Sequence, residues 1–520
     1  MTKMYIFSLV LLLVGLASAI WPLPLKYTSG ETVLWIDRDV QVIYSGTNQV
    51  QLPSIRQWRF SRWLSALHLQ TTRYSSGSNV NSTASSIIIS TAVSNVRETL
   101  FEKNFVPWKF HPRNSDYEPS FNASRIYIKS IILRQDGTDP KDVYKPLDGG
   151  VDESYSLSLT ADGKATITAS TSIGLAHGLT SFTQLFYKHT GGGGVYTNLA
   201  PVQILDAPKF QHRGLNMDVS RSYYAPSDIF RTIDALAYTK MNRLHIHMTD
   251  SQSWPLEVPA LPGLAGKGAY GHGLSYSPAV IRSIQEYGAA RGVEVFLEID
   301  MPGHTSSIAF SHPELVAAFN EQPNWSDYAA EPPSGTLKLN SSAVYDFLHT
   351  LFDDLLPRVF PYTSYFHTGG DEVNANAYTL DDTVQSNDTA VIQPLMQKFI
   401  DQIHDRVRAA GLTPVVWEEM LLQWNISLGP DVVVQTWQSD EAVLQTVEHG
   451  HKAIAGNYEF WVSLFLFIIK RSLTTIVPRL WSRPMARLLP RHIQSDILAV
   501  RRLLLSTQEL AIDLFVRSIG

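Results

Sequence analysis

Cysteine is absent from the 520-residue chain. Its absence excludes disulfides, zinc-thiolate sites, thiol nucleophiles and redox motifs. Charged residues are sparse at 17%, whereas hydrophobic residues make up 44%, so the chain can bury a large core and extensive disorder is not expected. The apolar runs at residues 6–16 and 462–469 are both too short to cross a bilayer, so we expect no stable membrane span.

Positive charge is also scarce, since the formal net charge is −6. Phosphate binding needs clustered Lys and Arg, so nucleic acid is not an expected partner. His245 and His247 lie two apart on one predicted strand, a spacing that can indicate a metal site. No third ligand is evident, so we interpret them as core histidines and predict neither a metal nor a cofactor.

The N-terminus has the pattern of a signal peptide at residues 1–19. Lys3 supplies the positive start, residues 6–16 the apolar stretch, and Ala17-Ser18-Ala19 a small-residue cleavage site. We therefore expect a secreted protein, with a membrane anchor as the alternative. Six Asn-x-Ser/Thr sequons agree with export and predict a glycoprotein. They are Asn81, Asn122, Asn324, Asn340, Asn387 and Asn425.

Residues 20–205 predict a smaller α+β domain. Four runs have the composition of strands, at residues 86–90, 125–129, 155–159 and 165–169. Two have the periodicity of amphipathic helices, at residues 54–69 and 173–187.

From about residue 209, strand-like and helix-like runs alternate. The predicted strands are residues 214–218, 244–248, 293–297, 364–368, 414–417, 432–436 and 452–455. Helices are predicted around residues 229–237 and 390–410. This alternation is typical of a parallel sheet, and seven such strands predict a (β/α)8 barrel at residues 206–461, an α/β fold that lacks a recognisable last strand.

Polar residues follow the ends of these strands, where barrel enzymes place their chemistry. They are Asp218, Asp250, Asp300, Asp371, Glu372, Glu418, Glu419 and Gln438. Asp371 and Glu372 are adjacent and would point to opposite faces of a regular strand. Because Gly369-Gly370 precedes them, the backbone can turn both carboxyls toward one pocket. Paired carboxyls suit the acid–base chemistry of glycoside hydrolysis, and each raises the pKa of the other.

The segment His367-Thr-Gly-Gly-Asp-Glu-Val-Asn374 resembles the signature of family 20 glycoside hydrolases, the β-N-acetylhexosaminidases. Other segments resemble the family in the same order, over about residues 20–461. They are residues 212–221, 245–254, 298–304, 416–419 and 434–437.

The resemblance implies a substrate-assisted, retaining mechanism in which the substrate's acetamido oxygen attacks the anomeric carbon. It implies that Glu372 is the general acid and base, and that Asp371 holds the acetamido group. It further implies that Arg213 grips sugar hydroxyls and that Asp250 and His304 support the acid. Trp417 and Trp437 would wall the acetamido pocket.

Each implied role has a structural alternative. The Asp371-Glu372 pair could be a solvated turn, Arg213 a surface ion pair, and both tryptophans plain core. His304, placed by Pro302-Gly303, could orient a carboxyl or cap a helix, and we interpret Asp300 as structural.

The tail at 462–520 departs from the family. It holds eight Arg and one Lys against three acidic residues, a net charge of +6, although the whole chain is acidic. After Trp461 the family continues with Tyr-Leu-Asp and later supplies a Trp and a Glu, whereas this chain continues with Val462-Ser463-Leu464. A retained intron followed by a shifted reading frame would produce such a break.

The sequence thus predicts an exo-acting β-N-acetylhexosaminidase that acts on chitooligosaccharides or glycans ending in N-acetylglucosamine or N-acetylgalactosamine. Family resemblance suggests a homodimer. The alternatives are a catalytically impaired sugar-binding remnant, an endo-chitinase on the same barrel, and a protein tethered to a membrane through residues 462–469.

Overall fold

A computed structural model describes residues 20–45, 80–103, 118–120, 124–146, 150–191 and 193–457. The predicted signal peptide, the predicted helix at 54–69 and the basic tail lie outside these residues. In the described part of the chain, no helix is both long and apolar enough to cross a membrane. The described residues form two compact units, one up to residue 368 together with 373–414, and the other made of residues 369–372 and 415–457.

The first unit begins with a six-stranded mixed sheet in the order β1-β2-β4-β3-β6-β5. The first half of β1 pairs antiparallel with β6, and its second half pairs parallel with β2. The strands are β1 (Lys26–Ser45), β2 (Tyr127–Gln135), β3 (Tyr155–Leu159), β4 (Lys164–Ala169), β5 (Tyr187–Lys188) and β6 (Val195–Asp206). β6 ends beside the domain boundary expected at residue 205.

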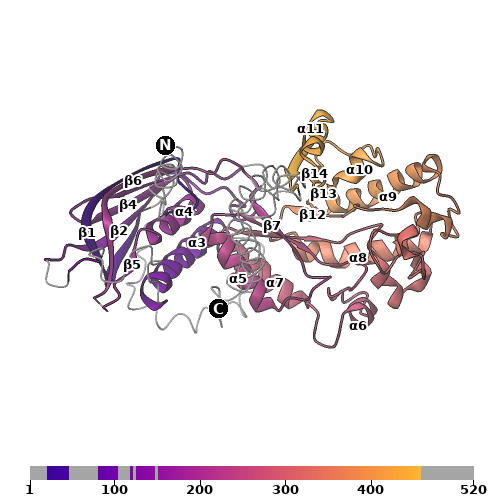
Figure 1. The fold of residues 1–520 in the computed structure, drawn as a ribbon, viewed down its shortest axis with the longest axis horizontal. Coiled ribbons are helices and arrows are strands. Elements are labelled where there is room, and N and C mark those ends of the chain that lie inside the picture. The colour runs from indigo at the N-terminus through magenta and orange to yellow at the C-terminus, as the bar shows by residue number, and fades with distance from the viewer. Residues whose placement is uncertain are drawn as a thin grey trace, which may run out of the picture. The chain divides into compact units, whose positions relative to one another are not determined.

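Two helices, α3 (Val80–Arg97) and α4 (Ser172–Thr183), pack against each other beside this sheet (Figure 1). The side chain of Thr171 caps α4 by accepting a hydrogen bond from the amide of Gly174. Gly178 lets α4 approach the sheet, because a Cβ there would lie 2.4 Å from Ile167. The helix expected at 173–187 ends earlier, and Tyr187 begins β5.

The strand expected at residues 86–90 is wrong, because these residues lie within α3. Three consecutive isoleucines at 87–89 favour a strand on local propensity. Ile88 and Ile89 are instead buried on one side of the helix, and Val93 and Val96 continue the buried face. Burial of this apolar face outweighs the weak β-propensity of its residues.

The first unit also carries four parallel strands that lie side by side in chain order, β7 (Gly214–Asp218), β8 (Arg243–His247), β9 (Glu294–Glu298) and β12 (Tyr365–His367). Helices follow the strands, as a β/α barrel requires. The longer ones are α5 (Pro226–Tyr238), α7 (Pro278–Ala289), α8 (Ser342–Val359) and α9 (Thr389–Ala409).

The second unit continues the same pattern with three parallel strands in chain order. They are β13 (Thr413–Trp417), β14 (Val433–Thr436) and β15 (Lys452–Ala455), with α10 (Glu418–Leu422) after β13 and α11 (Asp440–Glu448) after β14. All seven predicted barrel strands are therefore present within two residues of their expected bounds. The described residues hold no eighth strand of this sheet.

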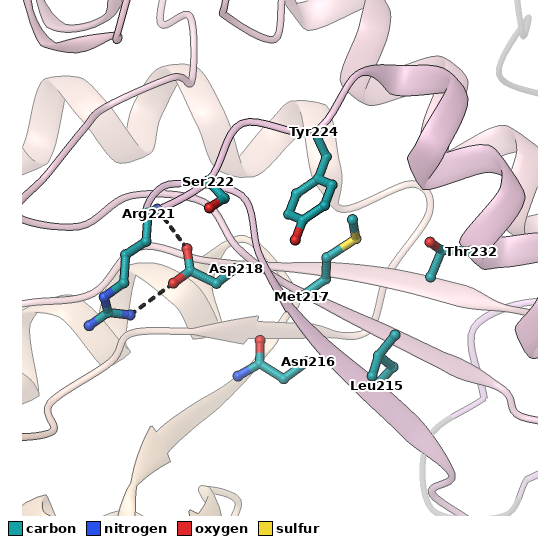
Figure 2. Close-up of a pocket in the computed structure, with 8 residues that line it drawn as sticks. All are labelled: Leu215, Asn216, Met217, Asp218, Arg221, Ser222, Tyr224 and Thr232. Atoms are coloured by element: carbon teal, nitrogen blue, oxygen red, sulfur yellow. Dashed lines mark hydrogen bonds and ion pairs between the residues drawn. The ribbon is translucent and has the colours of Figure 1, made fainter. Parts of the chain in front are cut away.

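β7 differs from its neighbours in burial. Every residue of β8 and β9 is buried, whereas no residue of β7 is, and Leu215 is 43% exposed. Among the described strands β7 pairs with β8 alone, and no described strand pairs with its other edge. A cavity of about 350 Å³ is lined by four consecutive β7 residues, 215–218, and by the loop that follows (Figure 2). Because consecutive strand residues point to opposite faces, this cavity follows that edge of the strand.

Candidate active site

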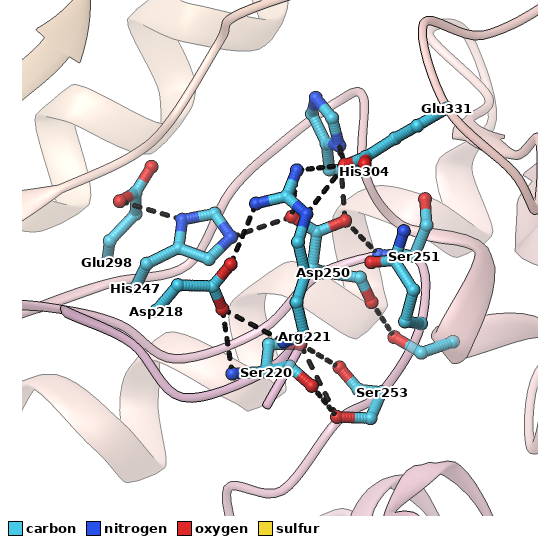
Figure 3. A network of polar contacts seen from close by, with 12 residues as sticks. Asp218, Ser220, Arg221, His247, Asp250, Ser251, Ser253, Glu298, His304 and Glu331 are labelled. Carbon is cyan, nitrogen blue, oxygen red and sulfur yellow. Dashed lines mark hydrogen bonds and ion pairs between the residues drawn. The ribbon is translucent and has the colours of Figure 1, made fainter. Parts of the chain in front are cut away.

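In the first unit, polar side chains collect where β7, β8 and β9 end. Asp218 is the last residue of β7, Asp250 follows β8, and Asp300 and His304 follow β9. The carboxyl ends of parallel strands lie at one edge, so side chains distant in sequence meet there. Figure 3 shows the resulting network of polar contacts.

Asp250 lies at the centre of this network and has no exposed surface. Its Oδ2 lies 2.8 Å from Nε2 of His247 and 3.0 Å from Nη2 of Arg221, and its Oδ1 lies 3.1 Å from Nδ1 of His304. Burial alone would raise the pKa of Asp250, but His304 and His247 lower it well below its usual range. Asp250 is therefore ionised throughout the physiological pH range.

Arg221 joins three carboxylates. It donates to Asp218 Oδ2 at 2.9 Å and, through Nε, to Glu331 Oε1 at 2.6 Å, in addition to its contact with Asp250. Asp218 is fixed in turn by the backbone amides of Ser220 and Arg221, both at 2.9 Å. Burial lowers the pKa of Arg221, but Asp250, Asp218 and Glu331 raise it above the ordinary value for arginine. The guanidinium is thus a fixed positive charge beside the cavity of Figure 2.

His304 has a backbone φ of +53°, a left-handed conformation that residues other than glycine seldom adopt. Such a conformation costs on the order of 1–3 kcal/mol and persists only where the surroundings enforce it. The hydrogen bond to buried Asp250 orients the imidazole. The sequence left open whether His304 orients a carboxyl or caps a helix. The contact with Asp250 favours the first interpretation.

The second unit contains the predicted catalytic pair. Gly369 and Gly370 have φ values of +71° and +106°, and Glu372 follows with +53°, so the backbone leaves the regular strand geometry before both carboxyls. A Cβ on Gly370 would lie 2.6 Å from Cγ of Met420, so this glycine also allows close packing on α10. Asp371 and Glu372 are both half-buried.

Glu419 adds a third carboxyl to this unit and is almost fully buried. Its Oε1 accepts hydrogen bonds from Nε1 of Trp437 at 3.0 Å and from the Gln438 side chain at 2.8 Å. Burial, and secondly the charge of Asp371, raise the pKa of Glu419 to about 7. Trp417, which precedes α10, is 7% exposed, whereas Trp437 is half-buried.

Arg213 does not join the polar network. It precedes β7, at the end of the strand opposite to Asp218, and its side chain pairs with Glu153 and donates to the carbonyl of Lys240 at 2.9 Å. These contacts join the barrel to the α+β domain. The sugar-binding role expected for Arg213 has no support in this position, whereas Arg221 occupies the edge where the other polar groups meet.

The sequence-based analysis missed the roles of Arg221, Glu298 and Glu331. Arg221 follows the end of β7 by three residues, a signal that could have separated it from Arg213. Glu298 ends β9 and supplies the partner of the two β8 histidines, with Oε2 2.8 Å from His245 Nε2 and 2.9 Å from His247 Nδ1. Glu331 lies in a loop without a motif, so only the folded chain brings it to Arg221.

Three side-chain groups in the first unit have donor sets that suit a metal ion. They are His245-Glu298-His367, His247-Asp250-Asp300 and Asp250-His304-Glu331. In the second and third groups, Arg221 already places a cation 3.0 Å from Asp250. In the first, Glu298 contacts both histidines of β8 directly. The mutual contacts neutralise the charges, so we derive no step from a metal.

Comparisons with known proteins agree with this geometry. The family model "Glycosyl hydrolase family 20, catalytic domain" matches residues 210–466, and the model "beta-acetyl hexosaminidase like" matches residues 20–185. A "Beta-hexosaminidase" of Arthroderma benhamiae is 38% identical over 462 residues, which cover 86% of this chain and 76% of the relative.

Two further relatives are longer than the part matched here. A "Chitooligosaccharidolytic beta-N-acetylglucosaminidase" of Ostrinia furnacalis is 32% identical over 330 residues, 59% of this chain and 55% of the relative. The solved chitobiase of Flavobacterium johnsoniae matches with a TM-score of 0.63 at 24% identity, over 84% of this chain and 59% of that one, and supports the fold.

The family match, the parallel β/α architecture and the Asp-Glu pair after two glycines lead to one assignment. The chain belongs to glycosyl hydrolase family 20, with a TIM-barrel catalytic domain preceded by an α+β domain.

Proposed function

We propose that the chain is an exo-acting β-N-acetylhexosaminidase that removes terminal N-acetylglucosamine or N-acetylgalactosamine with retention of configuration. The observation that carries the proposal is the placement of Asp371 and Glu372 directly after two glycines of positive φ, in a member of this family. Their unit also contains the carboxyl of Glu419, whose pKa is raised by burial and secondly by the charge of Asp371.

The proposed mechanism needs no enzyme nucleophile. The acetamido oxygen of the substrate bonds to the anomeric carbon while the bond to the leaving oxygen breaks and Glu372 gives that oxygen a proton. Asp371 accepts a hydrogen bond from the acetamido N–H and stabilises the positive charge that develops. Glu372 then takes a proton from water, which attacks the anomeric carbon and restores the acetamido group.

Two sets of residues bind the sugar in this proposal. Trp437, oriented by its hydrogen bond to Glu419, and Trp417 wall the acetamido group. Arg221, rather than Arg213, binds hydroxyls, because its guanidinium lies beside a cavity and is held by buried Asp250. Support of the general acid by Asp250 and His304 remains a prediction.

Turnover of an aryl N-acetylglucosaminide by the purified chain tests the proposal. We expect Glu372→Gln and Asp371→Asn each to abolish most of it, while Glu441→Gln, an exposed carboxyl on α11, leaves it unchanged. Equal activity in all three variants would refute the assignment of the catalytic pair. Chitohexaose separates the exo from the endo reaction, since an exo enzyme releases single sugars.

A catalytically impaired sugar-binding protein is the alternative, and the sequence after Trp461 favours it. There the chain lacks the family's Tyr-Leu-Asp and later Trp and Glu motifs. Calorimetric binding of N-acetylglucosamine without turnover would identify this case. Sequencing of transcripts across residues 461–462 tests whether the tail comes from a retained intron.

We also propose that the protein is secreted and glycosylated. The asparagines of the four sequons at 324, 340, 387 and 425 are exposed. Peptide N-glycosidase should lower the mass of the secreted protein, and Asn387→Gln should remove one glycan from it. A single mass before and after treatment would contradict the proposal. The expected homodimer can be tested by light scattering.

A further inference from the structure

The strongest feature not used by the proposed mechanism is the buried histidine His247. It is the last residue of β8 and is 5% exposed. Its Nε2 lies 2.8 Å from Asp250 Oδ2, and its Nδ1 lies 2.9 Å from Glu298 Oε2 (Figure 3). Both partners are carboxylates without exposed surface.

We propose that His247 is a positioning residue, an imidazolium clamped between Glu298 and Asp250 that fixes the Asp250 carboxylate toward His304 and Arg221. The kinetic test of this role rests on the proposed function, whereas the NMR test does not. It assigns Glu298 the role of a counter-charge that no substrate touches, since its side chain is completely buried.

Each imidazole nitrogen of His247 faces a buried carboxylate, through a hydrogen bond to Asp250 and an ion pair with Glu298. A carboxylate only accepts hydrogen bonds, and His247 has one carboxylate oxygen within 3 Å of each nitrogen. A neutral imidazole has a single N–H and would leave one of these contacts without a proton. The charged form places a positive charge against both carboxylates, so the contact with Asp250 becomes a charge-assisted hydrogen bond and the contact with Glu298 an ion pair.

The charges around His247 agree with this reading. Burial alone would lower the pKa of His247, but Glu298 and Asp250 raise it well above the usual value. Glu298 also contacts His245 through the same oxygen and His367 through the other. Burial lowers the pKa of His367 to about 3, so that ring is neutral. The carboxyl of Asp300 also lies within 4.8 Å of the donor atoms of His247 and Asp250 and adds to the negative charge.

The clamp acts on Asp250 through a shared oxygen. Oδ2 of Asp250 receives both His247 and Arg221, while Oδ1 receives His304. Without His247 the carboxylate can rotate toward Arg221, which itself also reaches Glu331. A shift of about 1 Å in a positioning group can cost on the order of 100-fold in rate.

The matched control is His245, on the same face of β8. Its Nε2 contacts the same Glu298 oxygen at 2.8 Å, and its ring stacks on Phe296. It contacts Glu298 but, unlike His247, not the Asp250 carboxylate. A purely structural role predicts similar effects of His245→Asn and His247→Asn, whereas the proposal predicts different ones.

We expect His247→Asn to lower kcat about 10- to 100-fold, with KM changed less than threefold and a shifted acidic limb of the kcat–pH profile. His245→Asn should change kcat less than threefold. Equal losses in the two variants, or a loss in KM alone, would overturn the proposal.

Nitrogen-15 NMR of histidine-labelled protein reports the charge of His247 directly. It requires neither turnover nor correct folding of the His247→Asn variant. In the unmodified chain His247 should remain an imidazolium at pH 8. In Glu298→Gln the neutral amide removes one counter-charge, so His247 should lose its proton at a lower pH. A neutral His247 at pH 6, or no change in Glu298→Gln, overturns the proposal. Absence of turnover with an imidazolium in place would count against the proposed function alone.

Discussion

Substitution of each of the two arginines that flank β7 tests which of them binds the sugar. Arg221 contacts Asp250, Asp218 and Glu331, of which only Asp250 is completely buried. The other two carboxylates are about one-third exposed, so solvent screens these pairs and each contributes about 0–1 kcal/mol. The energetic argument therefore depends on Asp250.

Arg221→Met would leave the Asp250 carboxylate with one partner fewer. Truncation of one member of a buried, hydrogen-bonded charge pair costs about 2–5 kcal/mol. This cost lowers stability, whereas kcat/KM falls through the lost contact with a sugar hydroxyl, which is worth about 1.5–3 kcal/mol or about 10- to 150-fold. For the loss of stability the lower end is the better expectation, because His247 and His304 still hold Asp250.

The control is Arg213→Met. Arg213 pairs with Glu153 between the barrel and the α+β domain. This variant should unfold at lower urea concentration, with kcat/KM within about threefold of the parent while it is folded. Kinetics with an aryl N-acetylglucosaminide and urea unfolding separate the two effects. The reasoning is refuted if the folded Arg213 variant loses catalysis and the Arg221 variant keeps it.

Three further predictions concern stability. The pKa of Glu419 in the folded chain is raised to about 7, so its contribution to stability is present below its unfolded value of 4.5 and is lost as pH rises through 7. Glu419→Gln should remove this pH dependence of the unfolding free energy measured in urea, which is on the order of 3 kcal/mol. Gly370→Ala should destabilise the fold by about 1–3 kcal/mol, and Met420→Ala should not restore it fully because φ is +106°. Arg243→Met should cost about 3–5 kcal/mol in urea unfolding, since it leaves the buried carboxylate of Glu294, 3.1 Å away, without its cation; a cost below 1 kcal/mol would contradict this.

The barrel strands could be predicted from sequence because short runs of strand-forming residues alternate along the chain with helix-forming ones. The expected bounds of 155–159, 214–218 and 452–455 agree with β3, β7 and β15. In contrast, the isoleucine run in α3 has strand propensity, and only its packing against α4 explains the helix. Local propensity is a small energy that tertiary burial overrides.

Several residues of the candidate site could be predicted from the sequence, but the contacts between them could not. The sequence indicated Asp250 and His304, and the structure joins them by a hydrogen bond of 3.1 Å. It could not rank Arg213 against Arg221, because both lie in the segment at 212–221 that resembles the family, one before β7 and the other after it. It also could not place Glu331, whose loop reaches Arg221 across 110 residues of chain.

The unpaired edge of β7 affects how well the backbone amides of this strand are protected from hydrogen exchange. An edge strand leaves alternate N–H and C=O groups without a sheet partner. The amides of an edge strand exchange with solvent through small local openings. The amides of a central strand exchange only when a larger part of the fold opens. Hydrogen exchange along residues 215–218, compared with residues 244–247 of the fully buried β8, therefore reports whether another strand closes the sheet in solution. Slow exchange on both strands would mean that another strand covers the second edge of β7 in solution, and fast exchange on β7 alone would mean that this edge stays uncovered.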